Sequence, residues 1–563
     1  MSGREETVSS DALAIGILII GGVVGVVAGG CWLAAQASLL LVGRSGASAP
    51  FSGSPSFVVQ LIRDRQVTAA WDTAYPDAAS LVPAAFWSVL AVLILLIAVG
   101  AALGILGWQR RTQPSQVDPA RWATRRTQRR LAVPADPAKR RWRLVAGRAL
   151  GRRMLLAGHD CVSAVVFGPN GSGKTTGLIV PNVLDWDGPV VITTAKPQDL
   201  QPLCAARAVH GPVWVIAPGG APGHQLAGWS PIDAAVDAEA ADRLAEWMVD
   251  SSGMADDPKA RPWNAQARKY LKGLLLAAHL SGDGIAGWVE WIHAGERARD
   301  HVEDLLRTAG EDGAAQDYAS TWQIHEEGKG SVLFTALGIA DTYSRPGILT
   351  AARAGGFTPA DLFDRAGTLC VVVPNADGDR FAPYFTTLLS AIIHTAEQRA
   401  ARQGGPIEPR LLLALDEAGN VFRYPRLPHL LTTSRGNGIQ LLLIYHDLAQ
   451  LEHLYGGRSV ARTVVSNAKM RMLLPGVADL DTLRYWSDLM GQTRTHSHGT
   501  TTGGDGRRSR SRNEHTDHLA PLHLLQQLPD GQAVLLYQNL PPARVRLLPW
   551  YAERRFRHLR DAP

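Results

Sequence analysis

A phosphate-loop motif constrains the fold of this chain more than any other feature. It reads Gly-Pro-Asn-Gly-Ser-Gly-Lys-Thr-Thr over residues 168–176 and fits the pattern G-x-x-x-x-G-K-[ST] without a mismatch. A short apolar run, 164–167, precedes it, and residues 176–183 begin a helix that Pro181 would bend or end. Strand, glycine-rich turn and helix N-terminus together form a cradle of backbone N–H groups for phosphate oxygens. The motif therefore predicts that the chain binds a nucleoside triphosphate.

The side chains of this loop predict separate roles in such a site. Lys174 can reach the β- and γ-phosphates, and the hydroxyl of Thr175 can ligate Mg²⁺. A glycine-rich turn without function is the alternative, but strand, lysine, threonine and helix are all in place. The predicted nucleotide-binding set is Gly168, Gly171, Ser172, Gly173, Lys174, Thr175 and Thr176.

A second apolar run ends in two carboxylates. Residues 411–415 read Leu-Leu-Leu-Ala-Leu and are followed by Asp416 and Glu417. A run of this composition is typical of a buried strand in a parallel sheet. Asp416 can hold Mg²⁺ directly or through water, and Glu417 can orient and deprotonate the attacking water. The two motifs together predict an ATPase that uses ATP and Mg²⁺, with the metal held by Thr175 and Asp416.

A long insertion separates the two motifs. Lys174 and Asp416 lie 242 residues apart, more than one nucleotide-binding core needs. Residues 234–350 show helical apolar spacing over 234–251, 264–280 and 296–308, and an apolar strand resumes at 368–374. The pattern predicts an α/β fold, with a doubly wound nucleotide-binding core over 154–233 and 351–563 and an all-α domain over 234–350.

Two segments are long and apolar enough to cross a bilayer. Residues 12–43 and 78–109 each run for 32 residues without a charge, whereas roughly 20 apolar residues suffice. A cleaved signal peptide is the alternative for the first segment. However, Arg4 stands among Glu5, Glu6 and Asp11, so the basic region that opens such a peptide is missing. We expect a retained hairpin of two transmembrane helices.

Basic residues predict the orientation of this hairpin. Residues 110–153 contain 14 Lys or Arg against two acids, whereas the loop 44–77 between the spans holds three arginines. By the positive-inside rule, residues 1–11 and the large C-terminal part lie in the cytoplasm and the loop lies outside. We interpret 110–153 as a basic juxtamembrane arm against anionic lipid headgroups, with phosphates of nucleic acid as the alternative.

Further motifs, taken in order, resemble one family over nearly the whole chain. The hairpin, the arm, the phosphate loop, the helical insertion and the late Asp-Glu strand together resemble the type IV secretion coupling proteins, the TraG/TraD-like DNA-pumping ATPases of conjugation. No single element after the phosphate loop is specific, but their order is. The additional segments that match are 119–123, 190–196, 229–232, 434–439, 441–451 and 464–492.

The resemblance implies a RecA-like core, six subunits around a channel, and an all-α domain over the cytoplasmic mouth. Single-stranded DNA with its relaxase, or a protein effector, would be handed to the secretion channel. Arg435 matches the arginine that enters the neighbouring subunit's site, with pairing to a local acid as the alternative. His446 stands where the family usually has a glutamine thought to sense the γ-phosphate, and Thr194 where an aspartate is common.

Two alternative functions remain open at this point. One is an FtsK-like membrane DNA translocase without a secretion channel, and the other is a docking receptor that keeps the nucleotide fold but hydrolyses poorly.

Residues 493–518, rich in Gly, Ser, Thr and Arg, are typical of a flexible loop. A more specific hypothesis is that this loop also contacts translocating DNA, beyond serving as a flexible connection.

Overall fold

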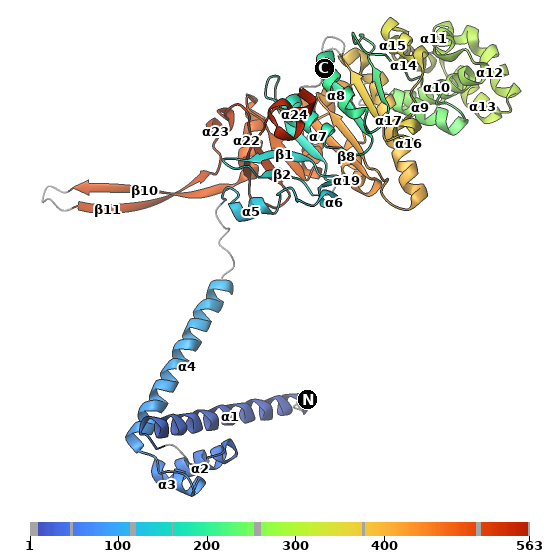
Figure 1. Ribbon diagram of the computed structural model, residues 1–563. Coiled ribbons are helices and arrows are strands. Elements are labelled where there is room, and N and C mark those ends of the chain that lie inside the picture. The colour runs from blue at the N-terminus through green and yellow to red at the C-terminus, as the bar shows by residue number, and fades with distance from the viewer. Residues whose placement is uncertain are drawn as a thin grey trace. The chain divides into compact units, whose positions relative to one another are not determined.

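The computed structural model describes residues 10–44, 49–112, 120–159, 161–252, 261–373, 378–502 and 508–560. The chain divides into two compact units, Met1–Asp118 and Pro119–Pro563 (Figure 1). Each unit has its own hydrophobic core, and each is described by itself.

The smaller unit consists of helices around a small aromatic core. The ring of Phe57 packs edge-on against Trp71 and Phe86, with centroid separations of 5.1 and 5.9 Å. In the segment between the two predicted spans, the described residues 49–77 are largely helical and partly packed. The helices of this unit are α1 (Ser10–Leu41), η1 (Phe51–Gly53), α2 (Ser54–Asp64), α3 (Val67–Ala74) and α4 (Pro83–Thr112).

One helix among the described residues is long and apolar enough to span a membrane. It is Pro83–Gly104 within α4, which is 22 residues long and in which almost no residue is buried inside the molecule. The predicted start of this span at residue 78 is wrong: the helix begins at Pro83, because proline suits the first turn, where its missing N–H is not needed. The first predicted span, 12–43, falls mostly on α1, where side chains before Gly25 lie outside the described residues.

The larger unit is built on a mixed sheet of 11 strands within the described residues. Seven neighbouring strands, β9 to β5 in the order below, are parallel, and four antiparallel strands extend one edge. In spatial order the strands are β2 (Leu155–Ala157), β1 (Val145–Ala149), β13 (Ala543–Arg546), β12 (Gln532–Tyr537), β9 (Met470–Leu473), β3 (Ala164–Phe167), β8 (Ile439–Tyr445), β7 (Leu411–Leu415), β4 (Val190–Thr194), β6 (Thr368–Val372) and β5 (Val213–Ile216).

Helices cover both faces of the parallel part, which explains why its strands read as continuous apolar runs. Along β3, Val165 and Phe167 join the core of one face, whereas Ala164 and Val166 join the core of the other. The first face carries α17 (Gly378–Gln403), α19 (Leu427–Asn437), α20 (Leu448–Leu454), α21 (Arg458–Asn467), α22 (Leu480–Met490) and α23 (Leu522–Gln526). The second carries α7 (Val180–Leu184) and α8 (Leu200–Arg207), and the chain ends with η6 (Trp550–Ala552), η7 (Arg554–Phe556) and α24 (Arg557–Arg560).

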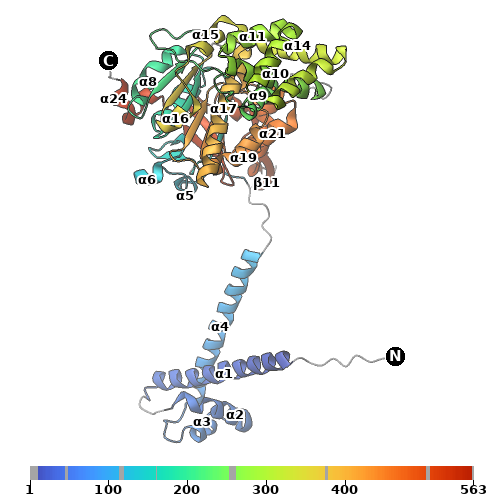
Figure 2. The ribbon, with the colours of Figure 1, turned by 90° about the vertical axis from the view of Figure 1, so that its right-hand side faces the viewer.

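The predicted helical insertion connects two neighbouring parallel strands, β5 and β6. Its helices form a cluster beside the sheet (Figures 1 and 2). The helical stretch continues past the expected boundary at 350 and ends at Asp364. Its last helix begins after Thr358, whose side chain forms a capping box with Asp361. The helices are α9 (Ala238–Ser251), α10 (Arg261–Ser281), α11 (Gly284–Ala294), η4 (Gly295–Ala298), α12 (Arg299–Thr308), α13 (Asp312–Ser320), η5 (Thr321–Gln323), α14 (Glu326–Ser344), α15 (Pro346–Ala354) and α16 (Pro359–Asp364).

The predicted basic arm, 110–153, is not separate from the nucleotide-binding domain over its whole length. From Ala120 onward it belongs to the larger unit, where α5 (Arg125–Arg129) and α6 (Pro137–Arg140) lead into β1 of the sheet. The N–H of Ala120 donates to Gln492 O at 2.8 Å, and the guanidinium of Arg544 lies 4.9 Å from the Trp122 ring centroid. Charge counting missed the buried residues Trp142, Leu144 and Ala146, which lie among the arginines and just before or within β1.

The predicted flexible loop at 493–518 is also wrong. Residues Gln492–Thr502 (β10) and Arg508–His518 (β11) pair antiparallel in one continuous register, from Gln492 opposite His518 to Thr502 opposite Arg508. The resulting ribbon projects from the larger unit (Figure 1). Composition alone indicated a loop because the segment has few apolar residues, but its threonines favour extended backbone and the two halves pair with each other.

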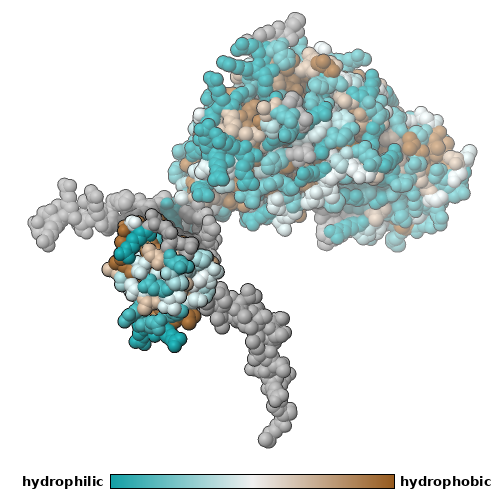
Figure 3. Space-filling model, turned by 60° about the horizontal axis from the view of Figure 1, so that its bottom comes forward, coloured by the Kyte–Doolittle hydropathy of each residue, from teal (hydrophilic) through white to brown (hydrophobic). Residues whose placement is uncertain are grey.

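The exposed surfaces of the two units differ in character. Large apolar side chains are exposed along α4, as in a helix that faces lipid. The face of the larger unit seen in Figure 3 is mainly hydrophilic, with hydrophobic side chains scattered over it. The large exposed apolar side chains among the described residues of α4 are Trp87, Val92, Ile94, Leu95, Leu96, Ile97, Val99 and Leu103.

Candidate nucleotide-binding site

The two predicted motifs meet at one edge of the sheet. β3 and β7 lie on either side of β8, and all three strands run parallel. Their carboxyl ends therefore share an edge, which is where ligands bind in open α/β sheets. The phosphate loop follows β3 directly, and Asp416 follows β7. Residues 242 positions apart in the sequence are brought into contact by this topology.

The glycines of the phosphate loop have two different structural reasons. Gly171 and Gly173 have φ angles of 84° and 83°, a conformation that other residues rarely adopt. Gly168 is required by close packing, since a Cβ there would lie 2.7 Å from Leu474 Cδ1 and 2.8 Å from Ser172 Oγ. Its N–H donates to Tyr445 O at 2.9 Å and so joins the loop to the end of β8.

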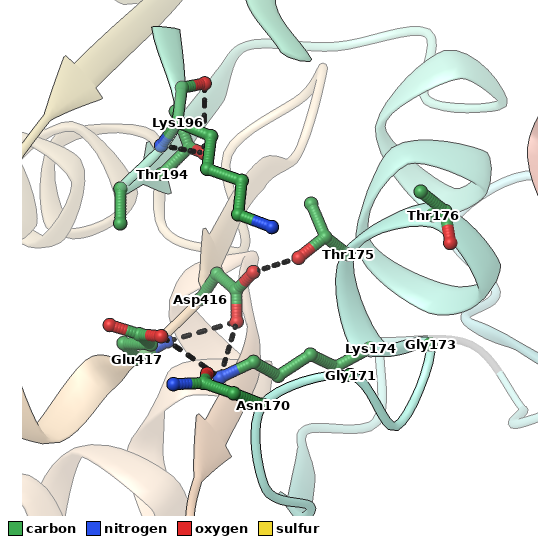
Figure 4. A pocket seen from close by; sticks show the side chains of 11 residues that line it. Asn170, Gly171, Gly173, Lys174, Thr175, Thr176, Thr194, Lys196, Asp416 and Glu417 are labelled. Atoms are coloured by element: carbon green, nitrogen blue, oxygen red, sulfur yellow. Dashed lines mark hydrogen bonds and ion pairs between the residues drawn. The ribbon is translucent and has the colours of Figure 1, made fainter. Parts of the chain in front are cut away.

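A cavity of about 370 Å³ opens between the loop and the carboxylates (Figure 4). A helical turn, η2 (Thr175–Ile179), begins at one wall and continues as α7, where Pro181 contributes no N–H. The opposite wall is the end of β4. The lining residues are Asn170, Gly171, Gly173, Lys174, Thr175, Thr176, Thr194, Ala195, Lys196, Asp416 and Glu417.

Lys174 lies between the two carboxylates of the cavity. Its Nζ is 3.1 Å from Glu417 Oε1 and 3.6 Å from Asp416 Oδ1, and all three side chains are nearly buried. The hydroxyl of Thr175 donates to Asp416 Oδ2. Burial raises the pKa of Asp416, and the nearby Lys174 ammonium and the Thr175 hydrogen bond oppose that rise. The arrangement holds opposite charges together in a site of low solvent access, where their interaction is strengthened.

Backbone contacts fix the two carboxylates at the end of β7. The hydroxyl of Thr193, on the neighbouring strand β4, donates to Asp416 O at 2.8 Å. Glu417 follows in the left-handed region, with φ 52° and ψ 47°, and begins the short helix α18 (Ala418–Val421). Such a conformation is strained for a residue with a Cβ, and strain of this kind concentrates at functional sites.

Two predicted catalytic residues do not line the cavity of their own chain. Arg435 is exposed near the C-terminal end of α19. His446 follows β8 directly and is half-buried, and its backbone N–H donates to Gln450 Oε1 at 2.9 Å. Within the predicted binding set, Gly168 and Ser172 support the loop without lining the cavity.

Lys196 is a cavity residue to which the sequence assigned no role in the site. It follows β4, and its side chain points toward Thr175 and Asp416 (Figure 4). β4 pairs directly with β7, so any residue just after β4 lies at the same edge as the carboxylates. The apolar run 190–194 ending at a lysine was the available signal, but the strand order that gives it meaning is not readable from the sequence.

The residues present fit a magnesium nucleotide. Lys174, Thr175 and Asp416 line one cavity of about 370 Å³ together with the backbone of the loop at Gly171 and Gly173. The hydroxyl of Thr175 and the carboxylate of Asp416 are oxygen ligands of the kind that Mg²⁺ prefers. Lys174 and the backbone of the loop supply the positive side of a phosphate site.

Fold and site together define a P-loop nucleotide-binding protein of the parallel α/β class. The family model described as type IV secretory system conjugative DNA transfer matches residues 130–562, and the chain belongs to that family.

Known proteins agree with this assignment. The conjugal transfer protein TraG of Escherichia coli is 26% identical over 368 residues, which are 60% of this chain and 56% of that relative. The chain thus spans little more than half the length of that relative. The bacterial conjugative coupling protein TrwBdeltaN70, in its unbound monoclinic form, matches with a TM-score of 0.57 and 16% identity, over 77% of this chain and 93% of that one. The plasmid coupling protein TrwB in complex with ADP and Mg²⁺ matches with a TM-score of 0.50 and 17% identity, over 69% and 85%. These structural likenesses establish the fold.

Proposed function

We propose that the chain is an ATP-hydrolysing coupling protein of conjugative DNA transfer. It uses ATP and Mg²⁺ to move a single-stranded DNA–relaxase complex, or a protein effector, to a type IV secretion channel. The observation that carries the proposal is the joint placement of Lys174, Thr175, Asp416 and Glu417 in one cavity at the end of parallel strands. Family membership and the ADP and Mg²⁺ bound to the structurally similar TrwB support it.

Each of these four side chains has a role that its position permits. Lys174 would leave the carboxylates to contact the β- and γ-phosphates of a bound nucleotide, and the oxygens of Thr175 and Asp416 would hold Mg²⁺. When bound there, Mg²⁺ would supply positive charge beside the phosphate oxygens. Glu417 orients the attacking water and accepts its proton. The buried setting strengthens each of these interactions relative to water.

Arg435 supplies charge to a neighbouring subunit's site in this proposal. Its exposure on α19 and its absence from the lining of its own cavity are compatible with action in trans, in a homo-hexamer around a channel. Rings mixed from Arg435→Ala and Glu417→Gln subunits test this. Each mixed ring contains interfaces that pair an intact Arg435 with an intact Glu417, so hydrolysis should recover above both parents. Mixed rings without such recovery would contradict the trans role.

His446 adjoins the phosphate loop through β8 and is proposed to couple nucleotide state to substrate. Gly168 N–H contacts Tyr445 O, so the residue after Tyr445 lies next to the entry of the loop. A neutral histidine donates one hydrogen bond, as the family's usual glutamine can. Replacement of His446 by Gln should therefore keep hydrolysis within about threefold of the original rate, whereas Ala should uncouple hydrolysis from transfer.

The membrane arrangement is proposed to be two-pass, in the cytoplasmic membrane. α4 supplies one span, and α1, 32 residues long, supplies the second. The loop between them lies outside, and the larger unit lies in the cytoplasm with the nucleotide core and the all-α domain. The basic residues after α4 favour this orientation.

A pair of variants tests the central proposal. Lys174→Ala and Glu417→Gln should each abolish ATP hydrolysis and DNA transfer in a donor cell, while full-length protein remains at normal abundance in the membrane. Lys469→Ala, an exposed lysine far along the chain from the cavity motifs, is the matched control and should keep both. Normal transfer in both inactive variants would instead indicate a docking receptor. Hydrolysis without any dependence of transfer on the secretion channel would indicate an FtsK-like translocase.

A further inference from the structure

A chain of side-chain hydrogen bonds runs from Glu417 to the turn after β8. Asn420 Nδ2 donates to Glu417 Oε2 at 3.3 Å, and Gln450 Nε2 donates to Asn420 Oδ1 at 3.4 Å. The backbone N–H of His446 then donates to Gln450 Oε1 at 2.9 Å. Asn420 lies on α18 and Gln450 on α20, so the chain of contacts bridges two helices that follow different strands.

The direction of these hydrogen bonds is fixed at both ends. A carboxylate can only accept and a backbone N–H can only donate. Asn420 must therefore turn its amide nitrogen to Glu417, which leaves its oxygen for Gln450. Gln450 must turn its oxygen to His446, which leaves its nitrogen for Asn420. The side chains at positions 420 and 450 must each both donate and accept, as a carboxamide does, and an isosteric carboxylate at either position removes a required donor.

A glycine allows the two helices to approach this closely. A Cβ at Gly419 would lie 2.7 Å from Gln450 Nε2 and 2.9 Å from Leu454 Cδ1. Gln450 is positioned from its own side as well, because its backbone N–H donates at 2.8 Å to Asp447 Oδ1, which caps α20. The contact between α18 and α20 is thus built into the fold from both elements.

The contacts close a ring that begins and ends in the phosphate loop. Gly168 N–H joins the loop to Tyr445 at the end of β8, and Lys174 joins it to Glu417. When Lys174 moves to a phosphate, Glu417 loses its ammonium partner and keeps the hydrogen bond from Asn420. A general base must stay within hydrogen-bond reach of the proton that it removes from the attacking water. The remaining hydrogen bond from Asn420 therefore decides where the Glu417 carboxylate points.

We propose that Asn420 and Gln450 are positioning residues that hold the Glu417 carboxylate toward the attacking water and tie it to the His446 turn. This inference rests on the proposed ATPase function. It predicts that loss of either carboxamide lowers the rate of hydrolysis without weakening nucleotide binding, since neither residue lines the cavity.

The test measures ATP hydrolysis and nucleotide affinity of the detergent-solubilised full-length chain. Asn420→Asp and Gln450→Glu should each lower kcat about 10- to 100-fold, with KM and the affinity for a non-hydrolysable ATP analogue within about threefold of the original. Because the two residues act in series, the double variant should be no slower than the slower single variant. Gly419→Ala should lower kcat in the same way, by displacing Gln450.

Matched controls separate this role from general damage. Asn467→Asp and Gln266→Glu change half-buried amides that donate to acceptors elsewhere in the larger unit, and Gly330→Ala adds a Cβ with no atom within 4 Å. All three should keep kcat. If the original chain hydrolyses ATP and both Asn420→Asp and Gln450→Glu keep its kcat, the positioning role of Asn420 and Gln450 is wrong, but the proposed ATPase function stands. If the original chain hydrolyses ATP no faster than Lys174→Ala, both the proposed ATPase function and the positioning role of Asn420 and Gln450 are wrong.

Discussion

Glu417 holds a left-handed backbone conformation at the point where β7 gives way to α18. A residue with a Cβ in this region costs about 1–2 kcal/mol relative to ordinary backbone. The position nevertheless carries Glu and not Gly, and its side chain is held by Lys174 and Asn420. The strain is therefore retained at a residue whose side chain the proposed reaction needs.

At position 417, a glycine substitution should leave the folded chain more stable than an alanine substitution does, the reverse of the usual order of stability. Glu417→Gly should be more stable than Glu417→Ala by about 1 kcal/mol, because only glycine adopts the left-handed conformation without strain. Glu327, exposed in the first turn of α14, is the control position, where alanine should be the more stable. Midpoints of thermal unfolding of the four variants measure both differences. Alanine more stable at both positions would contradict the conformation assigned to Glu417.

Lys196 should discriminate between nucleotides by their terminal phosphate. Its amino group points into the cavity from the β4 wall, opposite the phosphate loop (Figure 4). We expect Lys196→Ala to weaken binding of a non-hydrolysable ATP analogue about tenfold and that of ADP by less, since a cation there adds to the charge around the outer phosphate. Equilibrium titration with both nucleotides measures the ratio, with Lys469→Ala as the control. Equal losses for both nucleotides would place Lys196 elsewhere on the bound molecule.

Among the secondary-structure elements, those with strong local signals were predicted well. Helices were expected over 264–280 and 296–308, and α10 and α12 cover 261–281 and 299–308. The strand predicted at 368–374 is β6, which ends at Val372, with residue 374 outside the described residues, and the run 411–415 is β7. In these segments apolar periodicity and flanking polar residues agree with the final packing. The ribbon β10–β11 and the strand β1 were missed because each is stabilised by a partner strand, which no local pattern encodes.

Arg207 shows how a buried charge can hold an element in place. It lies in α8 with no exposed surface, and its guanidinium donates to Gly188 O at 2.7 Å and to Thr368 Oγ1 at 2.9 Å, as well as to Trp186 O. Burial lowers its pKa to about 10, which still leaves it charged at neutral pH. The contacts join α8 to the end of α7 and the start of β6.

Arg207→Met should destabilise the larger unit by about 3–5 kcal/mol, because it leaves buried carbonyl oxygens without donors. Arg402→Met, an exposed arginine on α17, should change stability by less than about 0.5 kcal/mol. Thermal unfolding followed by intrinsic tryptophan fluorescence compares the two. A midpoint for Arg207→Met equal to that of the control would show that the buried contacts contribute no net stability.

At the scale of the whole molecule, the sequence predicted which motifs meet but not the sheet that joins them. The phosphate loop and the Asp-Glu pair each imply a strand end, so their meeting at one edge follows from general rules of parallel sheets. The order β3-β8-β7-β4 does not follow from either motif. Without that order, the sequence does not indicate that Lys196 lies in the cavity or that Asn420 and Gln450 contact each other, since each depends on which strands are neighbours.

The proposed two-pass topology makes a prediction about the segment between α1 and α4. Alkaline phosphatase, which folds only in an oxidising compartment, should be active when fused after Asp64 and inactive when fused after Thr112, and a cytoplasmic fluorescent reporter should give the reverse pattern. The reason is that basic residues are concentrated after α4, with 14 Lys or Arg over 110–153, and are sparse between the helices. Fusions after Asp64 and Thr112 that report the same side would show that α4 does not span the membrane. An active phosphatase after Thr112 together with an inactive one after Asp64 would instead show that the orientation is inverted and that residues other than the arginines set it.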